Sequence, residues 1–146
     1  MLIEGYVSMK IPNHLKHRPI IKREKYSDID GHYDKDKTDA QGLSLGLAQW
    51  GNNDLSVKVW RHTGNRWSRQ SEELPLHRVI DLTSLICETL YFTKHGKLPD
   101  ISLDLSISDN QILQAALRNT LNEDFVEDNL DTPLKRLSKM LKELGY

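Results

Sequence analysis

The sequence predicts an α+β fold, in which a small antiparallel β-meander packs on about three helices in a single layer-on-layer domain. Apolar residues alternate with polar ones between residues 43 and 75, but beyond Pro75 they recur every three or four positions. A length of 146 residues is typical of one domain with its own core. We therefore expect one domain over 1–146, divided into an irregular N-terminal segment (1–42), a β-meander (43–75) and a mainly helical part (76–146).

The N-terminal segment contains few regular elements by its sequence. Pro12 and Pro19 exclude a continuous helix, because proline lacks the backbone N–H and clashes with the preceding turn. A candidate edge strand runs from Pro19 to Tyr26.

Strands are predicted at Leu43–Trp50 and Leu55–Arg61, separated by the turn-forming residues 51–54. Gly64 and Asn65 then suit a two-residue hairpin loop that requires positive φ. With that loop, Trp60 lies opposite Arg69, and His62 lies opposite Trp67.

The hairpin therefore has one aliphatic face and one aromatic, cationic face. Two interpretations of the second face stay open. In the first, Arg69 stacks on Trp60 and a helix or the N-terminal segment covers both. In the second, Trp60, Trp67, Arg69 and Arg78 form a binding site for an anionic or planar ligand. The first interpretation is the commoner fate of such residues.

The candidate catalytic residues are Glu72, Glu73 and His77. A histidine beside carboxylates can act as a general base, while Arg69 or Arg78 holds an anionic substrate. The alternative is structural: Glu72 or Glu73 pairs with Arg66 or Arg69, and His77 caps or packs in the first turn of a helix.

The helical part begins with a long amphipathic helix from Leu76 to Phe92, whose apolar stripe includes or borders Cys87. Ile101 to Ile107 alternate as in a short strand, and Ser108 with Gln111 resembles a capping box that opens a second helix. A last helix starts at Asp131 or Thr132 and stops at Gly145. The acidic residues between 123 and 131 are expected to form a solvated connection between helices.

No metal or cofactor is predicted. His14 and His17 have a ligand-like spacing, but the flanking prolines argue against the helix that would align them. Five aspartates between residues 28 and 39 lack the glycine and glutamate of a calcium-binding loop. Neither a glycine-rich phosphate loop nor a nucleophile elbow occurs in the sequence.

Composition limits the location and the partners. A net charge of −1 argues against nucleic acid, and no apolar run approaches the roughly 18 residues of a membrane span. The lone Cys87 and the absence of a secretory signal predict a cytoplasmic protein. The partners left open are a second copy in a homodimer, an anionic small molecule and another protein.

The stretches TDAQGLSLGLAQW (38–50), VWRHTG (59–64) and WSRQSEELPLHR (67–78) resemble a small family of uncharacterised bacterial proteins that share a domain of unknown function. The resemblance covers about residues 11–95. It implies a bacterial, cytoplasmic, stand-alone domain and assigns no activity or catalytic residue.

We therefore expect a non-catalytic binding or protein-interaction domain that uses the Trp and Arg face of the hairpin. The alternatives are a small enzyme for an anionic substrate, with His77 and Glu72 or Glu73 as acid and base, and a weak nucleic-acid binder.

Overall fold

The computed structural model describes residues 10–31, 36–68, 71–102 and 104–146 and has the α+β fold that the sequence predicts. Its described residues form a four-stranded antiparallel sheet followed by four α-helices. The chain divides into two compact units, Met1–Ile80 and Asp81–Tyr146, which we call the sheet unit and the helical unit. The single domain over 1–146 and the packing of the meander on the helices stay predictions.

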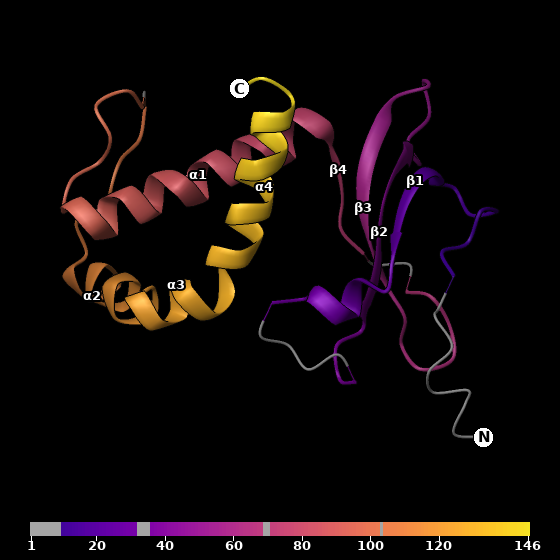
Figure 1. Cartoon of the computed structure of the whole chain (residues 1–146), viewed down its shortest axis with the longest axis horizontal. Helices are drawn as coiled ribbons and strands as arrows, with labels where there is room; N and C mark the ends of the chain where they lie inside the picture. The colour runs from indigo at the N-terminus through magenta and orange to yellow at the C-terminus, as the bar shows by residue number, and fades with distance from the viewer. Residues whose placement is uncertain (1–9, 32–35, 69–70, 103) are drawn as a thin grey trace. The chain divides into compact units, whose positions relative to one another are not determined.

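The sheet is a meander, because its strands lie side by side in chain order and each pair is antiparallel (Figure 1). The strands are β1 (Arg18–Glu24), β2 (Ala40–Leu47), β3 (Leu55–Arg61) and β4 (Glu73–Pro75). β1 coincides closely with the expected edge strand, so the segment 1–42 is less irregular than predicted. The short 3-10 helix η2 (Tyr26–Ile29) follows β1.

The hairpin after β3 differs from the prediction in its length. Its tight turn is present: Thr63 N–H donates to Arg66 O at 2.8 Å, Gly64 has a φ of 88°, and His62 pairs with Trp67. The polar stretch after Trp67 was expected to continue as a strand, but β4 includes only Glu73–Pro75. Arg69, expected opposite Trp60, lies outside the described residues.

Side chains on the two faces of the sheet differ in size and polarity, because direct cross-strand partners point to the same side. One face carries Gly42, Ser44 and Gly46 of β2, together with Ser56 and Trp60 of β3, and all five are buried. The opposite face carries aliphatic side chains and is only partly covered. The core of the sheet unit therefore lies on the side of the small and polar residues, which we call the inner face.

The described residues before β1, 10–17, cover the inner face. Ile11 is 2% exposed, and its N–H donates to Glu24 Oε1 at 3.2 Å. A Cβ at Gly42 would lie 2.7 Å from Ile11 Cδ1, so the absent side chain leaves the space that Ile11 fills. His17, farther along the segment, is 2% exposed.

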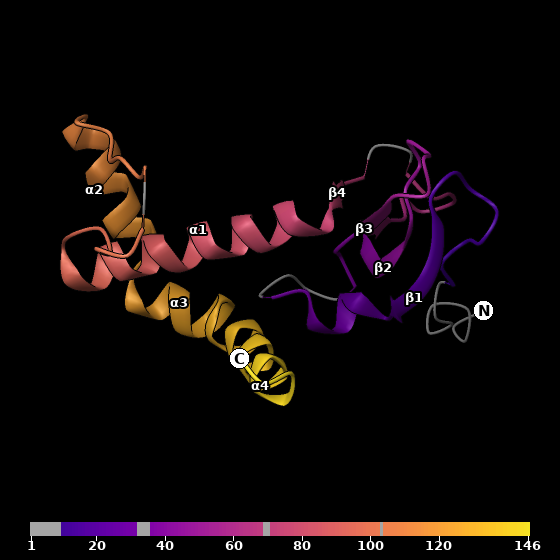
Figure 2. The same ribbon diagram turned by 90° about the horizontal axis from the view of Figure 1, so that it is seen from above.

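The helical unit is built from α1 (Leu76–His95, which starts in the sheet unit), α2 (Gln111–Thr120), α3 (Glu123–Asn129) and α4 (Asp131–Glu143). Two views place α2 beside the C-terminal end of α1 (Figures 1 and 2). There Phe92 is 5% exposed, and the guanidinium of Arg118 lies 5.4 Å from the centre of its ring. Among the described residues, no helix combines the length and apolarity needed to cross a bilayer.

Several expectations for the helical unit are wrong. The acidic segment forms α3, because Asn122 caps it and Glu123 and Asp124 interact favourably with the helix N-terminus. α2 is capped by Asn110, whose side chain accepts from two backbone N–H groups, rather than by Ser108. The described residues between 101 and 107 form no strand.

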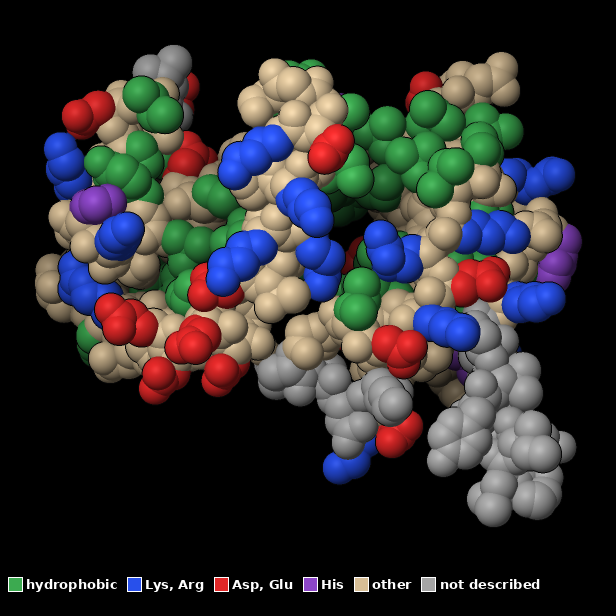
Figure 3. All heavy atoms as spheres, viewed as in Figure 1, with side chains coloured by type: hydrophobic (Ala, Val, Ile, Leu, Met, Phe, Trp, Pro, Cys, Tyr) green, Lys and Arg blue, Asp and Glu red, His purple; other side chains and the backbone are tan. Residues whose placement is uncertain are grey.

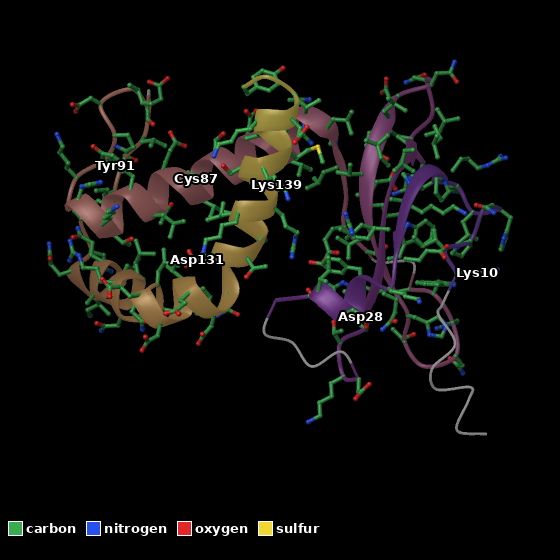
Figure 4. All side chains as sticks on the ribbon, in the orientation of Figure 1. Lys10, Asp28, Cys87, Tyr91, Asp131 and Lys139 are labelled. Atoms are coloured by element: carbon green, nitrogen blue, oxygen red, sulfur yellow. The ribbon has the colours of Figure 1, made fainter. Side chains whose placement is uncertain are left out.

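Cys87 was expected in or near the core, but it is exposed on α1 (Figure 4). The inward side of this helix is defined by Leu85, Glu88 and Phe92, which line one cleft together with α2 residues. Cys87 lies between these positions in sequence and is therefore rotated away from their side of the helix.

We predict that Gly46→Ala destabilises the sheet unit by about 1–3 kcal/mol, the usual cost of forcing a backbone shift. A Cβ at this position would lie 2.0 Å from Arg18 O of β1. Gly42→Ala is the matched control, because its Cβ meets the backbone only at an ordinary 3.4 Å from Arg23 O, and its close contacts are with the side chain of Ile11, which can shift more cheaply than backbone. Urea denaturation should rank Gly46→Ala as the more destabilised variant, and equal stabilities would contradict this close approach of β1 and β2.

Candidate functional site

The inner face of the sheet holds a buried polar cluster formed by His17, Ser44, Ser56, Trp60 and Glu73, which we call the His17 cluster. His17 comes from the N-terminal segment, and the other members come from β2, β3 and β4. Ser56 is fully buried, and the side chain of Glu73 is 2% exposed. Because buried polar groups are costly without partners, the hydrogen bonds within this cluster decide whether it stabilises the fold.

Every member of the cluster is joined to the next by a hydrogen bond. Trp60 Nε1 lies 2.7 Å from Ser44 Oγ, which lies 2.9 Å from His17 Nε2. On the other side of the ring, His17 Nδ1 lies 2.9 Å from Ser56 Oγ, and Ser56 Oγ donates to Glu73 Oε2 at 2.7 Å. His17 Nδ1 also lies 3.3 Å from Glu73 Oε2.

The direction of each bond follows from which groups can donate. The hydroxyl hydrogen of Ser56 goes to the Glu73 carboxylate, so Ser56 Oγ accepts from His17 Nδ1–H. His17 Nε2 then lacks a hydrogen and accepts from the Ser44 hydroxyl, which in turn accepts from the donor-only indole of Trp60. The cluster is therefore one continuous chain of donors that runs from Trp60 to Glu73 through a neutral imidazole.

The charge states agree with this chain. Burial lowers the pKa of His17 below 6.5 and outweighs its attraction to the Glu73 carboxylate. Burial raises the pKa of Glu73, but the N–H of Gln49, the Ser56 hydroxyl and His17 together bring it below 4.5. A neutral histidine thus contacts an ionised carboxylate whose other oxygen, Oε1, is buried without a hydrogen-bond partner.

The tryptophans of the hairpin belong to the same buried arrangement. Trp60 is 1% exposed and meets His17 and Trp67 edge to face, at centroid distances of 5.9 and 5.8 Å. The cation over its ring is Lys58, whose Nζ lies 4.8 Å from the centroid. His17, from the chain before β1, contacts the Trp60 ring, whereas the expected stacking of Arg69 on Trp60 concerns a residue outside the described ones.

Ser56, His17 and Glu73 are residue types of a hydrolytic triad, but their arrangement does not provide a nucleophile. The Ser56 hydroxyl donates to Glu73 and accepts from the imidazole, so His17 is not placed to act as its general base, as the histidine of a triad does. Ser56 is 0% and Ser44 5% exposed, which leaves neither oxygen accessible to a substrate. The His17 cluster is therefore structural, and it holds the N-terminal segment on the sheet.

The candidate catalytic residues are not brought together. Glu73 lies on the inner face, whereas Glu72, the residue before it, pairs with Arg61. The expected partners were Arg66 and Arg69, of which Arg69 lies outside the described residues. The side chain of His77 is exposed at the start of α1 and forms no hydrogen bond or ion pair with the described residues.

The remaining candidate ligand-binding residues are also separate from one another. Trp67 is partly exposed, and its ring lies 5.0 Å from that of His62. Arg78 is exposed on α1, and Arg69 lies outside the described residues. The structure therefore joins Trp60 to Trp67 but describes no contact between these two and Arg78.

A second candidate site lies on the outer, aliphatic face of the sheet. Its central row runs Ile21, Leu45, Val57, Leu74 across the four strands. These side chains line a groove of about 770 Å³ whose apolar lining also includes Leu43, Val59 and Val79. Hydrophobic side chains gather over the upper part of the strands in Figure 3.

Charged residues border this groove on two sides. The next row runs Arg23, Leu43, Val59, Glu72, with Val59 N–H donating to Glu72 O at 2.9 Å. Arg61 donates to Glu72 Oε1 at 2.8 Å and to Asp39 Oδ1 at 2.6 Å, and these bonds raise its pKa. The hydrogen bond with Arg61 in turn lowers the pKa of Glu72. The row therefore has an arginine at one end and the Glu72 carboxylate at the other, so its two ends carry opposite signs.

Sequence reasoning missed the roles of His17, Ser44 and Ser56. One signal was present: between Gly42 and Leu47, Gly and Ser alternate with Leu. A strand face made only of Gly and Ser leaves room for a close covering segment, whereas the leucine face was taken as the core. Within the residues that the structure describes, no group of three His, Cys, Asp or Glu side chains is placed to hold a metal ion.

We predict that Glu73→Ala lowers the free energy of unfolding by about 1–3 kcal/mol, because it leaves the buried hydroxyl of Ser56 without its acceptor and removes the acceptor of the Gln49 N–H. Glu72→Ala is the neighbouring control and should cost less than about 1 kcal/mol, since its ion pair is solvent-exposed. Chemical denaturation of both variants gives the comparison, and a reversed order would refute the assignment of Glu73 to the core.

We also predict that the sheet unit loses stability as the pH falls from about 6.5. The pKa of His17 is below 6.5 in the folded chain and near that value in the unfolded chain, so the unfolded chain binds the extra proton. Stability is thus fully present above pH 6.5 and is lost progressively towards the lowered folded pKa. Melting temperatures of wild type and His17→Gln between pH 5 and 8 should differ in slope, and parallel curves would exclude His17 as the cause.

Comparison with known proteins identifies a family but supplies no activity. No curated protein and no solved structure matches the chain. One family model, described as a family of unknown function (DUF6530), matches residues 9–146, which extends well beyond the stretch on which the resemblance was based. The chain belongs to this DUF6530 family.

Proposed function

We propose that this protein is a non-catalytic protein-interaction domain that binds another polypeptide through the outer face of its sheet. The main observation behind this proposal is the groove lined by Ile21, Leu45, Val57 and Leu74, because these apolar residues come from all four strands. An apolar centre with a charged border is the composition of a typical protein interface.

The exposure of the outer face supports this choice. Ile21 is 67% exposed, and Leu55 and Leu47 are 43% and 38% exposed. Contiguous apolar surface of this kind is costly to leave in water and commonly marks a site where another chain binds. In contrast, the inner face is sealed by the N-terminal segment and its hydrogen bonds.

The proposed binding surface is the outer face of the sheet, not the Trp and Arg face of the hairpin that the sequence favours. Trp60 makes its contacts with His17, Ser44 and Trp67, so its ring is engaged inside the sheet unit. The enzyme alternative lacks a supporting observation, because Glu72 and Glu73 lie on opposite sides of the sheet and the buried serines are closed to substrate.

Site-specific photocrosslinking tests the proposal. A benzophenone amino acid at Leu45 of the full chain, irradiated in the cells that naturally contain the protein, should give a covalent adduct with a polypeptide. The same group at Asn53, an exposed residue of the β2–β3 turn, should give none. Adding Val57→Lys to the Leu45 probe should abolish the adduct, because a charge then lies in the centre of the apolar row.

Melting temperatures show whether the variants fold. If Leu45 gives no adduct, or an adduct that survives Val57→Lys in folded protein, the outer face is not the binding surface.

A further inference from the structure

We propose that the polypeptide bound by the outer face is a second copy of the same chain, packed sheet against sheet about a two-fold axis parallel to the strands. This inference rests on the proposed function and names its partner. The order of charged and aliphatic residues across the sheet supports a second copy as the partner.

The charged row has opposite signs at its two ends. Arg23 lies on the edge strand β1, and Glu72 lies at the other edge, just before β4, with Leu43 and Val59 between them. The side chain of Arg23 is exposed and forms no hydrogen bond or ion pair with the described residues. Within that part of the chain it is a cation that lies beside an apolar groove without a partner.

A two-fold axis between β2 and β3, parallel to the strands, exchanges the two edges of the sheet. Arg23 of one copy then faces Glu72 of the other, and the same contact forms a second time by symmetry. The central row is matched in the same way, with Ile21 over Leu74 and Leu45 over Val57. Both rows therefore meet a complementary surface without any change in register.

An unrelated helix satisfies this pattern less well. A basic helix leaves Arg23 unpaired, and an acidic helix faces Glu72 with a like charge. A second copy pairs the charges at both edges of the sheet, because Arg23 meets Glu72 at each edge. Such a repeated contact is characteristic of a two-fold, self-complementary interface. Two sheets packed on each other with strands nearly aligned is also a common way to bury sheet faces.

The size of the face sets the strength of the dimer. β1, β2, β3 and β4 have 7, 8, 7 and 3 residues. With strands about 4.8 Å apart and about 3.3 Å per residue, the face is roughly 400 Å², or about 800 Å² for two copies. Stable specific interfaces usually bury about 1,200–2,000 Å², so the area of this dimer lies below that range. We therefore expect a weak dimer that forms only at high protein concentration, not a permanent one.

Charge reversal in two separate variants tests the geometry. Sedimentation velocity from about 10 to 500 µM should show wild type rising from its 16.9 kDa monomer towards a dimer. Arg23→Glu and Glu72→Arg should each stay monomeric, because each places like charges at both edges. An equal mixture of the two should recover the dimer, since every edge then pairs Glu with Arg.

Lys22→Glu is the matched control. Lys22 is the neighbour of Arg23 on β1 and is exposed, but it points to the opposite side of the sheet. This variant should dimerise like wild type. Circular dichroism and melting temperature establish that all variants fold.

Three results overturn the inference: a wild type that stays monomeric to 500 µM, an Arg23→Glu variant that dimerises as wild type does, or a mixture that fails to recover the dimer. The crosslinking experiment separates this failure from that of the proposed function. A Leu45 adduct with a chain of different mass refutes the second copy and leaves the proposed function standing, whereas the absence of any adduct removes both.

Discussion

The fold of the sheet unit depends on the hydrogen-bond chain from Trp60 to Glu73 through His17. This chain joins the N-terminal segment to three strands, and it allows the sheet to bury its polar side rather than its aliphatic side. Each buried hydroxyl in the chain both donates and accepts, so the usual penalty for burying polar groups is largely avoided. The orientation of the whole sheet follows from this one arrangement.

The two faces of the sheet have the opposite of their usual roles, because the face with small and polar residues is the buried one. Ile11 and His17 cover the inner face, and the aliphatic residues that would ordinarily form a core line a groove on the outer face of the sheet unit instead. Because the sheet buries Ser44 and Ser56, the alternation of the strands places Leu45 and Val57 on the outer face, which is the surface that we propose for binding.

Much of the fold could be predicted from local pattern. The alternation in β3, the turn at Gly64 and the pairing of His62 with Trp67 follow from strand period and turn chemistry, and all are present. The helices α1 and α4 were also predicted, because their apolar period and stop signals are strong. α3 was missed because a run of acidic residues suggests a solvated connection, whereas Asn122 provides the cap that makes it a helix.

The candidate site could not be predicted, because it depends on contacts between residues distant in sequence. His17 meets Ser44, Ser56 and Glu73 across separations of 27, 39 and 56 residues, and no local spacing reveals such a cluster. Glu72 and Glu73 are adjacent in sequence, but neighbouring strand residues point to opposite faces of the sheet. Glu73 therefore joins the buried cluster, whereas Glu72 lies on the outer face. Only the pairing of β3 with β4 determines which of the two is buried.

The tautomer of His17 tests the central claim most directly. Long-range proton–nitrogen NMR of the imidazole at pH 7.5 reports which ring nitrogen carries the hydrogen. The hydrogen-bond chain predicts a neutral ring with the hydrogen on Nδ1 and a bare Nε2 that accepts from Ser44. A hydrogen on Nε2, or a charged imidazolium at this pH, would contradict the chain and with it the reason that the polar face of the sheet is the buried one.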